Sequence, residues 1–159
     1  TLDLREVRLA RNELTGFPAV DLLTNVTHLC LSGNQLFEVP PEVGKLVKLS
    51  LLVLDDNQLL AVPPAVGQLQ ELCVLGLAGN MLETIPSEIR NLPKLKELRL
   101  DNNQLKTLPD EIVQLTQLSH LTVARNELNS IPQRIAGLGK LQALVRISSD
   151  VNIANSLLP

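Results

Sequence analysis

The chain has 159 residues, a formal net charge of −3 and 45% hydrophobic residues, of which very few are aromatic. This composition is too apolar for a disordered chain, and the acidic charge and scarcity of aromatic rings argue against general nucleic-acid binding. No apolar run approaches the roughly 18–20 residues of a membrane-spanning helix, and two cysteines are too few for a disulfide scaffold. We therefore expect a soluble protein built largely from leucine.

An asparagine recurs along nearly the whole chain at intervals of 22 or 23 residues. Leucine follows it two positions later, and leucine or valine precedes it by three and by five positions. The unit reads L-x-x-L-x-L-x-x-N-x-L, followed by x-x-[LIV]-P-x-x-[VI]-x-x-L. The repeated asparagines are Asn12, Asn34, Asn57, Asn80, Asn103 and Asn126.

Each repeat is predicted to begin with a short strand, because the L-x-L spacing buries one face of an extended chain. These segments include residues 29–31, 52–54, 75–77, 98–100 and 121–123. An asparagine amide both donates and accepts, so we expect the six asparagines to form a buried ladder that satisfies the turns after the strands. Proline then ends each strand, and a single helical turn is predicted at residues 43–46, 66–69, 89–92, 112–115 and 135–138.

Glycines on the far side of the repeat, at Gly44, Gly67, Gly137 and Gly139, are expected to supply positive φ angles in turns. The Pro-Pro pairs at residues 40–41 and 63–64 favour an extended entry into the helical turn.

This pattern resembles the leucine-rich repeat family over roughly residues 4 to 145, in the 23-residue class with L-P-x-x-[IV]-x-x-L after the asparagine. Within the family it is similar to the Ras-group repeats of intracellular scaffolds, to Roco proteins and to some bacterial repeat proteins. The resemblance implies an α/β fold, namely a right-handed solenoid with a concave parallel β-sheet. Short turns, 3₁₀ helices or single-turn helices would then form the convex side. The residue pattern agrees, because strands repeated in one direction pair as parallel neighbours.

We expect one domain of about seven coils over residues 1–145. Leu141 and Leu144 keep the register, whereas Arg146 stands where a core leucine belongs. Residues 146–159 are therefore predicted to be a degenerate terminal repeat or a C-terminal tail. The sequence enters its first strand within about six residues and without a capping segment, which suggests a piece of a longer protein.

The sequence contains no motif typical of a catalytic or metal site. His28 and His120 occupy the same repeat position four coils apart, too far to share a metal ion. Cys30 and Cys73 lie two coils apart, beyond the reach of a disulfide. We therefore expect no enzyme activity, no cofactor and no metal, and the reduced cysteines favour a cytoplasmic location.

Carboxylate pairs occur at residues 55–56 and 110–111. Neither pair has a histidine or a positioned lysine in its own repeat, so both are interpreted as solvated surface charge.

Side chains that alternate with the core leucines are expected to point onto the concave sheet. Leu51, Val53 and Val74 fall on neighbouring strands beside the small Gly76, giving an apolar centre with a charged rim, a layout typical of a protein interface. β-branched residues also favour strands for their own sake, so the apolar centre alone does not decide between the two interpretations. The candidate partner-binding residues are Arg8, Arg11, His28, Leu51, Val53, Asp55, Val74, Glu97, Arg99, Asp101, His120 and Arg125.

We predict a protein–protein interaction module or scaffold that binds a protein partner through the concave face, with no nucleic acid and no membrane insertion. By resemblance, the partner class includes small GTPases and other signalling proteins. An alternative is a targeting or autoinhibitory repeat domain of a larger multidomain enzyme, such as a Roco-type GTPase or a bacterial effector ligase. A third interpretation is a structural module that self-associates through its uncovered first coil.

Overall fold

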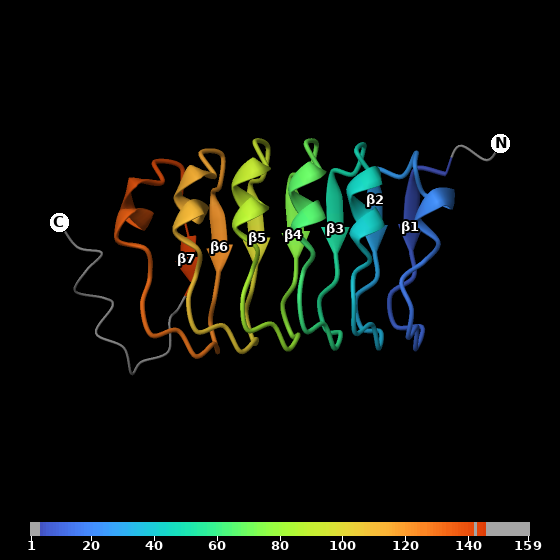
Figure 1. Cartoon of the computed structure of the whole chain (residues 1–159), viewed down its shortest axis with the longest axis horizontal. Coiled ribbons are helices and arrows are strands. Elements are labelled where there is room, and N and C mark those ends of the chain that lie inside the picture. Colours follow the sequence, from blue (N-terminus) through green and yellow to red (C-terminus); the bar gives the residue numbers. More distant parts are fainter. Residues whose placement is uncertain (1–3, 142, 146–159) are drawn as a thin grey trace.

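The computed structural model describes residues 4–141 and 143–145. Seven three-residue strands form one parallel sheet in which spatial order follows chain order (Figure 1). The strands are β1 (Glu6–Arg8), β2 (His28–Cys30), β3 (Leu51–Val53), β4 (Val74–Gly76), β5 (Glu97–Arg99), β6 (His120–Thr122) and β7 (Ala143–Val145). The connecting 3₁₀ helices are η1 (Val20–Leu22), η2 (Pro41–Lys45), η3 (Pro64–Gln68), η4 (Ser87–Asn91), η5 (Asp110–Gln114) and η6 (Gln133–Gly137).

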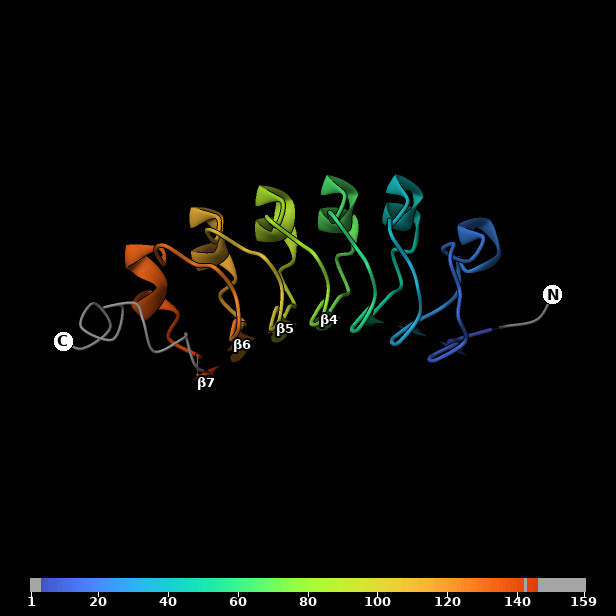
Figure 2. The same cartoon turned by 90° about the horizontal axis from the view of Figure 1, so that it is seen from below.

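The strands pair with a constant register of one repeat per step. Leu29 lies opposite Leu52, Leu52 opposite Leu75, and Leu121 opposite Leu144 in the last pair. Figure 2 shows the strands along the inner side of an arch and the 3₁₀ helices along its outer side. This arrangement confirms the predicted solenoid with a concave parallel sheet, and β7 continues the same register. The prediction for residues 146–159 lies outside the described residues.

The core is a continuous column of leucine, valine and isoleucine side chains between the sheet and the helices. The middle residue of each central strand, as in Leu52, Leu75 and Leu98, is essentially inaccessible to solvent. Val43 of η2 and Leu46 just after it close the same column from the convex side. Each coil is too thin to bury its apolar face alone, so stacking on neighbours is what removes this surface from water.

The prolines shape the entry into the helices as the sequence predicted. Pro40, Pro63 and Pro86 each precede a 3₁₀ helix with φ near −68° and ψ near 146°, the polyproline conformation. Each of these helices ends where the N–H of the following leucine donates to a carbonyl three residues earlier, as Leu46 does to Val43. The first repeat departs from this pattern, since η1 has only three residues.

The expectation for the convex glycines was wrong. Positive φ angles occur instead at the residue before each repeat asparagine, where Gly33 and Gly79 have φ of 65° and 66°. Non-glycine residues with φ between 54° and 58° take the same place in the other coils, at Arg11, Asp56, Asn102 and Arg125. The chain must turn sharply out of the strand there, which a left-handed residue achieves.

Gly67 has a different role, because it allows neighbouring 3₁₀ helices to approach closely. A Cβ atom at this position would lie 2.6 Å from the backbone oxygen of Glu88 in η4. A Cβ atom at Gly44 would likewise lie 3.0 Å from the backbone oxygen of Ala65. The absence of a side chain, and not a positive φ, is therefore what these helices require.

The repeat asparagines hold successive coils together through their side-chain amides. The Asn80 Oδ1 accepts from the Leu59 N–H at 3.0 Å, while its Nδ2 donates to the carbonyls of Leu54 at 3.1 Å and Leu77 at 3.0 Å. The same three contacts recur at Asn57 and Asn103. Asn12 differs, because it is exposed and, among the described residues, its Nδ2 donates to the Ala10 carbonyl alone.

Replacing Gly67 with alanine should destabilise the protein by about 1–3 kcal/mol, because the new methyl group meets a backbone oxygen that only a shift of η4 can relieve. Gly137→Ala is the matched control, since a Cβ atom there meets nothing within 4 Å. Urea denaturation of both variants measures the effect. Equal stability of the two variants would contradict the close approach.

Asn80→Leu should cost on the order of 1–3 kcal/mol, because it leaves buried backbone groups of two coils without a partner. Asn12→Leu should cost clearly less, since its amide is exposed and has one partner. Thermal and urea unfolding of the two variants tests this difference. If both variants lost the same stability, burial of the Asn80 amide would not explain how much that amide contributes to the stability of the fold.

Candidate functional site

The concave face carries two outward-pointing residues from each strand, together with those of the turn that follows. Of the twelve predicted partner-binding residues, the exposed ones are Arg8, Arg11, His120 and Arg125. The half-buried ones are His28, Leu51, Asp55, Val74, Glu97, Arg99 and Asp101. Val53 is only 9% exposed and belongs with the buried residues. The expected apolar centre is therefore much less open than the strand pattern alone suggested.

An ion pair across the middle of the sheet is one reason why the apolar centre is less exposed than predicted. The Arg99 side chain on β5 reaches back over β4, and its Nη1 lies 3.1 Å from Oδ2 of Asp55. A Cβ atom at Gly76 would come within 2.8 Å of Arg99 Nη2 and 2.7 Å of Asp55 Oδ1. Gly76 was expected to form an open, small-residue part of the apolar centre. It is instead covered, because its missing side chain leaves room for this ion pair.

Arg99 also contacts a second carboxylate, that of Glu97 on its own strand. The distance from Arg99 Nε to Glu97 Oε1 is 3.4 Å, a charge contact without hydrogen-bond geometry. Two carboxylates thus surround one guanidinium at the centre of the concave face. The charged rim predicted from the sequence therefore extends across the middle of the sheet.

The sequence analysis interpreted the carboxylate pair at residues 55–56 as solvated surface charge, but Asp55 is half-buried and bonded. Its Oδ1 accepts a hydrogen bond from the Ala78 N–H of the next coil at 2.9 Å, which ties two turns together. Burial raises the pKa of the Asp55 carboxyl above its ordinary value of 3.8, and the neighbouring Arg99 charge opposes this rise. The carboxylate therefore has a structural partner in the backbone and an electrostatic partner on the concave face.

Asp101 repeats this arrangement two coils later. Its Oδ1 accepts from the Ala124 N–H at 2.8 Å, and its Oδ2 accepts from the Thr122 hydroxyl. Both aspartates stand two positions before a repeat asparagine, and each satisfies the N–H at the corresponding position of the following coil. Asp101 was predicted as a contact for a partner, whereas these bonds also make it part of the scaffold.

An apolar hollow of about 240 Å³ lies on the concave face over β1, β2 and β3. Its lining residues are Val7, Arg8, His28, Cys30, Leu51 and Val53. The register explains it, because Cys30 lies between Arg8 and Val53 on adjacent strands and its short side chain leaves space between them. Sequence reasoning placed Arg8, His28, Leu51 and Val53 on this face. It did not select Cys30, although the small residue between two larger ones was the available signal.

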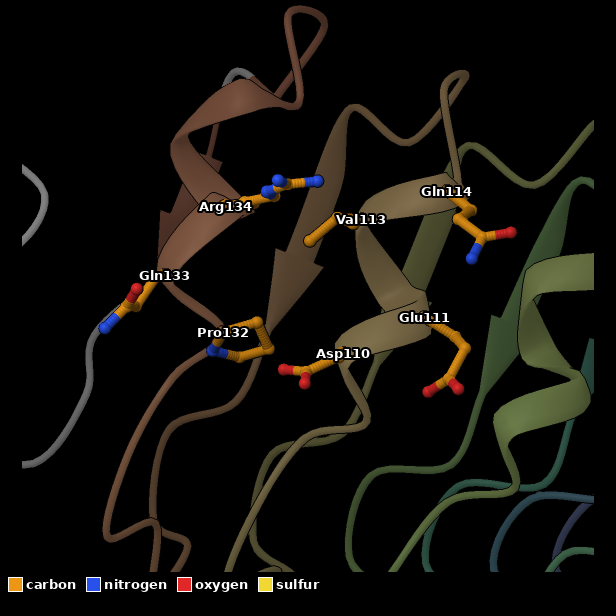
Figure 3. Close-up of a pocket in the computed structure, with 7 residues that line it drawn as sticks. All are labelled: Asp110, Glu111, Val113, Gln114, Pro132, Gln133 and Arg134. Atoms are coloured by element: carbon orange, nitrogen blue, oxygen red, sulfur yellow. The ribbon is translucent and has the colours of Figure 1, made fainter.

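A second hollow, of about 440 Å³, separates η5 from η6 on the convex side. Figure 3 shows Asp110, Glu111 and Val113 from η5 on one side and Arg134 from η6 on the other. Val113 occupies the repeat position of Gly44 and Gly67 and lines this hollow. The carboxylate pair at residues 110–111 lies here, and Glu111 pairs with Arg90 at 3.6 Å.

The described residues contain no cluster of three or more histidine, cysteine, aspartate or glutamate side chains that could hold a metal ion. Cys30 and Cys73 are both free thiols. Among the helices described, none is long and apolar enough to cross a membrane.

The raised pKa of Asp55 predicts a specific pH dependence of stability. The folded protein binds the Asp55 proton more tightly than the unfolded chain, so this group lowers the stability as the pH rises from 3.8 through its raised pKa. Asp55→Asn removes the carboxyl, so the stability of the wild type relative to this variant should fall across that interval. Urea denaturation at a series of pH values measures the difference. A relative stability that increases across the same interval would contradict the assignment.

Comparisons with known proteins agree with this geometry. The family model described as a leucine-rich repeat region matches residues 74–158, and a single leucine-rich repeat matches residues 25–46. No curated protein sequence gives a significant match.

Several solved structures resemble the chain. A leucine-rich repeat protein of Leptospira interrogans is 41% identical, with a TM-score of 0.85, over 87% of this chain and 36% of that one. An internalin of Listeria monocytogenes is 25% identical, with a TM-score of 0.74, over 86% of this chain and 39% of that one. The ectodomain of the receptor kinase GASSHO1/SCHENGEN3 from Arabidopsis thaliana, in complex with CASPARIAN STRIP INTEGRITY FACTOR 2, is 32% identical. Its TM-score is 0.78 over 91% of this chain and 21% of that one.

This chain thus spans well under half the length of each of these proteins. The family model covers more than half of the chain, and the described residues have parallel strands, 3₁₀ helices and a ladder of asparagine amides. The chain belongs to the leucine-rich repeat family.

Proposed function

We propose that this chain is a protein–protein interaction module that binds its partner through the concave face, with the hollow over β1–β3 at the centre of the contact. The hollow carries the proposal, because it combines an apolar floor with a charged rim. Leu51 and Val53 supply apolar surface, while Arg8 stands exposed at its border. Such a combination suits an apolar side chain of a partner with a carboxylate beside it.

The neighbouring Arg11 strengthens this end of the face. It is exposed, and among the described residues no carboxylate lies within ion-pair distance of its guanidinium. Arg8 pairs with Glu6 at 3.2 Å, an exposed contact that a partner carboxylate replaces at little cost. The opposite end, with His120 and Arg125, forms an outer part of the same proposed surface. The Asp55–Arg99 pair between the two ends keeps the middle of the face polar.

Leucine-rich repeats generally serve as protein-binding modules, and the Arabidopsis ectodomain described above is in complex with a factor. Both facts support a protein partner. The 23-residue spacing and its L-P-x-x-[IV]-x-x-L segment support membership of the Ras-group class. That resemblance makes a small GTPase or another signalling protein our proposed partner, and a cytoplasmic scaffold our proposed setting.

A second candidate is a repeat domain that targets or inhibits an enzyme in a larger protein. This candidate is proposed because the chain spans only part of the length of the solved proteins that it resembles. The complete reading frame separates the two candidates. A nucleotide-binding or ligase domain beyond the repeats of residues 1–145 supports the second, and its absence leaves the scaffold.

Leu51→Glu should abolish partner capture, because it places a charge inside the apolar hollow. Val47→Glu is the control, since Val47 is exposed apolar surface away from the concave strands. Affinity capture from source-cell lysate with mass spectrometry compares the wild type with both variants after circular dichroism confirms that each is folded.

Partners lost only with Leu51→Glu support the concave site. Partners retained by this variant, or lost equally with both, contradict it. Leu51 is preferable to Val53 for this test, because Val53 is buried and a charge there would threaten the fold itself.

A further inference from the structure

A group of exposed apolar side chains lies along the edge of the solenoid that follows the strands. Phe37, Leu60 and Met81 are 53%, 63% and 37% exposed and belong to the second, third and fourth coils. We name these three residues the apolar edge. They follow β2, β3 and β4 in the chain, and the segments that leave these strands lie along one edge of the solenoid (Figure 1). Single exposed apolar residues are common in proteins, but three on consecutive coils form a patch.

Backbone hydrogen bonds place these turns directly against one another. The Leu60 N–H donates to the Phe37 carbonyl at 3.4 Å. The Met81 N–H donates to the carbonyl of Leu59, the neighbour of Leu60, at 3.0 Å. The apolar edge is thus a contiguous row one coil apart, and it lies outside the concave hollow, whose lining shares none of these residues.

The fold does not require apolar residues at these positions. The repeat position of Phe37 and Leu60 is polar in the other coils, at Thr15, Glu83, Lys106 and Asn129. The repeat position of Met81 is likewise polar elsewhere, at Glu13, Gln35, Gln58, Gln104 and Glu127. Phe37 is moreover one of only two phenylalanines, and Met81 is the only methionine. Aromatic residues and methionine are enriched in interfaces, which suggests a role in recognition and not in folding.

The surroundings of the apolar edge are acidic. Glu38, Asp56 and Glu83 are exposed on the same three coils. Of these, Glu83 pairs with Lys106 at 3.7 Å. Within the part of the chain that the structure describes, no cation lies within ion-pair distance of Glu38 or Asp56. An occupant therefore has to bring apolar side chains together with positive charge, which also disfavours an anionic lipid surface.

From the exposure, contiguity and charge of this surface, we propose that the apolar edge binds an amphipathic cationic segment of a protein partner. Its apolar side chains cover Phe37, Leu60 and Met81, and its lysine or arginine residues pair with Glu38 and Asp56. This contact is independent of the concave site and gives the solenoid a second binding surface.

Three synthetic peptides of equal length test the proposal by calorimetric titration. One is an amphipathic peptide of leucine and lysine, the second has glutamate for lysine, and the third has serine for leucine. The wild type should bind the leucine–lysine peptide at least about tenfold more tightly than either other peptide, a difference of roughly 1.4 kcal/mol.

Phe37→Ser/Leu60→Ser should weaken this binding about tenfold or more, whereas Val47→Ser should leave it unchanged. Val47 is the matched control because its exposed fraction of 52% is close to that of Phe37. Glu38→Lys/Asp56→Arg should reverse the preference toward the leucine–glutamate peptide. Arginine already occupies the repeat position of Asp56 in two other coils, so this variant suits the fold.

Equal binding by the Phe37→Ser/Leu60→Ser variant, or equal binding of the serine–lysine peptide, would overturn the proposal. Loss of binding with Leu51→Glu would move the site to the concave face and overturn it too, whereas retention supports a separate surface. Light scattering tests whether a second copy of the chain occupies the apolar edge. A wild-type dimer that Phe37→Ser/Leu60→Ser abolishes would assign the edge to a second copy of the chain instead.

Discussion

The side-chain amide of the repeat asparagine is the contact on which the rest of this structure depends. After each short strand the chain turns sharply, which leaves backbone N–H and C=O groups inside the solenoid with no partner in their own coil. Asn57, Asn80 and Asn103 satisfy these groups in two coils at once, so each turn can be buried between its neighbours. Because each of these three amides links a coil to the one before it, the register of the strands and the column of leucines are tied to the same contact.

This constraint decides where function can lie. The repeat leucines and most of the repeat asparagines are buried, so a partner can contact only the residues between them and the turns. The concave face has an Asp55–Arg99 pair at its centre and an apolar hollow toward β1, and the edge beyond the strands carries Phe37 and Leu60. These features differ from coil to coil, while the scaffold beneath them repeats.

The repeated elements could be predicted from the sequence because their causes are local. Leu29 and Leu31 alternate with outward residues, and Pro40 fixes the entry to a helix within the same repeat. The closed centre of the concave face could not be predicted in this way. It depends on Arg99 reaching across a whole coil to Asp55, and on the room that Gly76 leaves for that reach. A strand pattern shows which face a residue occupies, but not how far a long side chain extends over its neighbours.

Hydroxyl-radical footprinting of the chain, alone and with its captured partner, tests the central claim most directly, because it reports side-chain exposure residue by residue. The account predicts that oxidation of His28, Cys30 and Leu51 falls when the partner binds, while that of convex Val113 is unchanged. Protection confined to the convex side, with unchanged oxidation of these three concave residues, would contradict it.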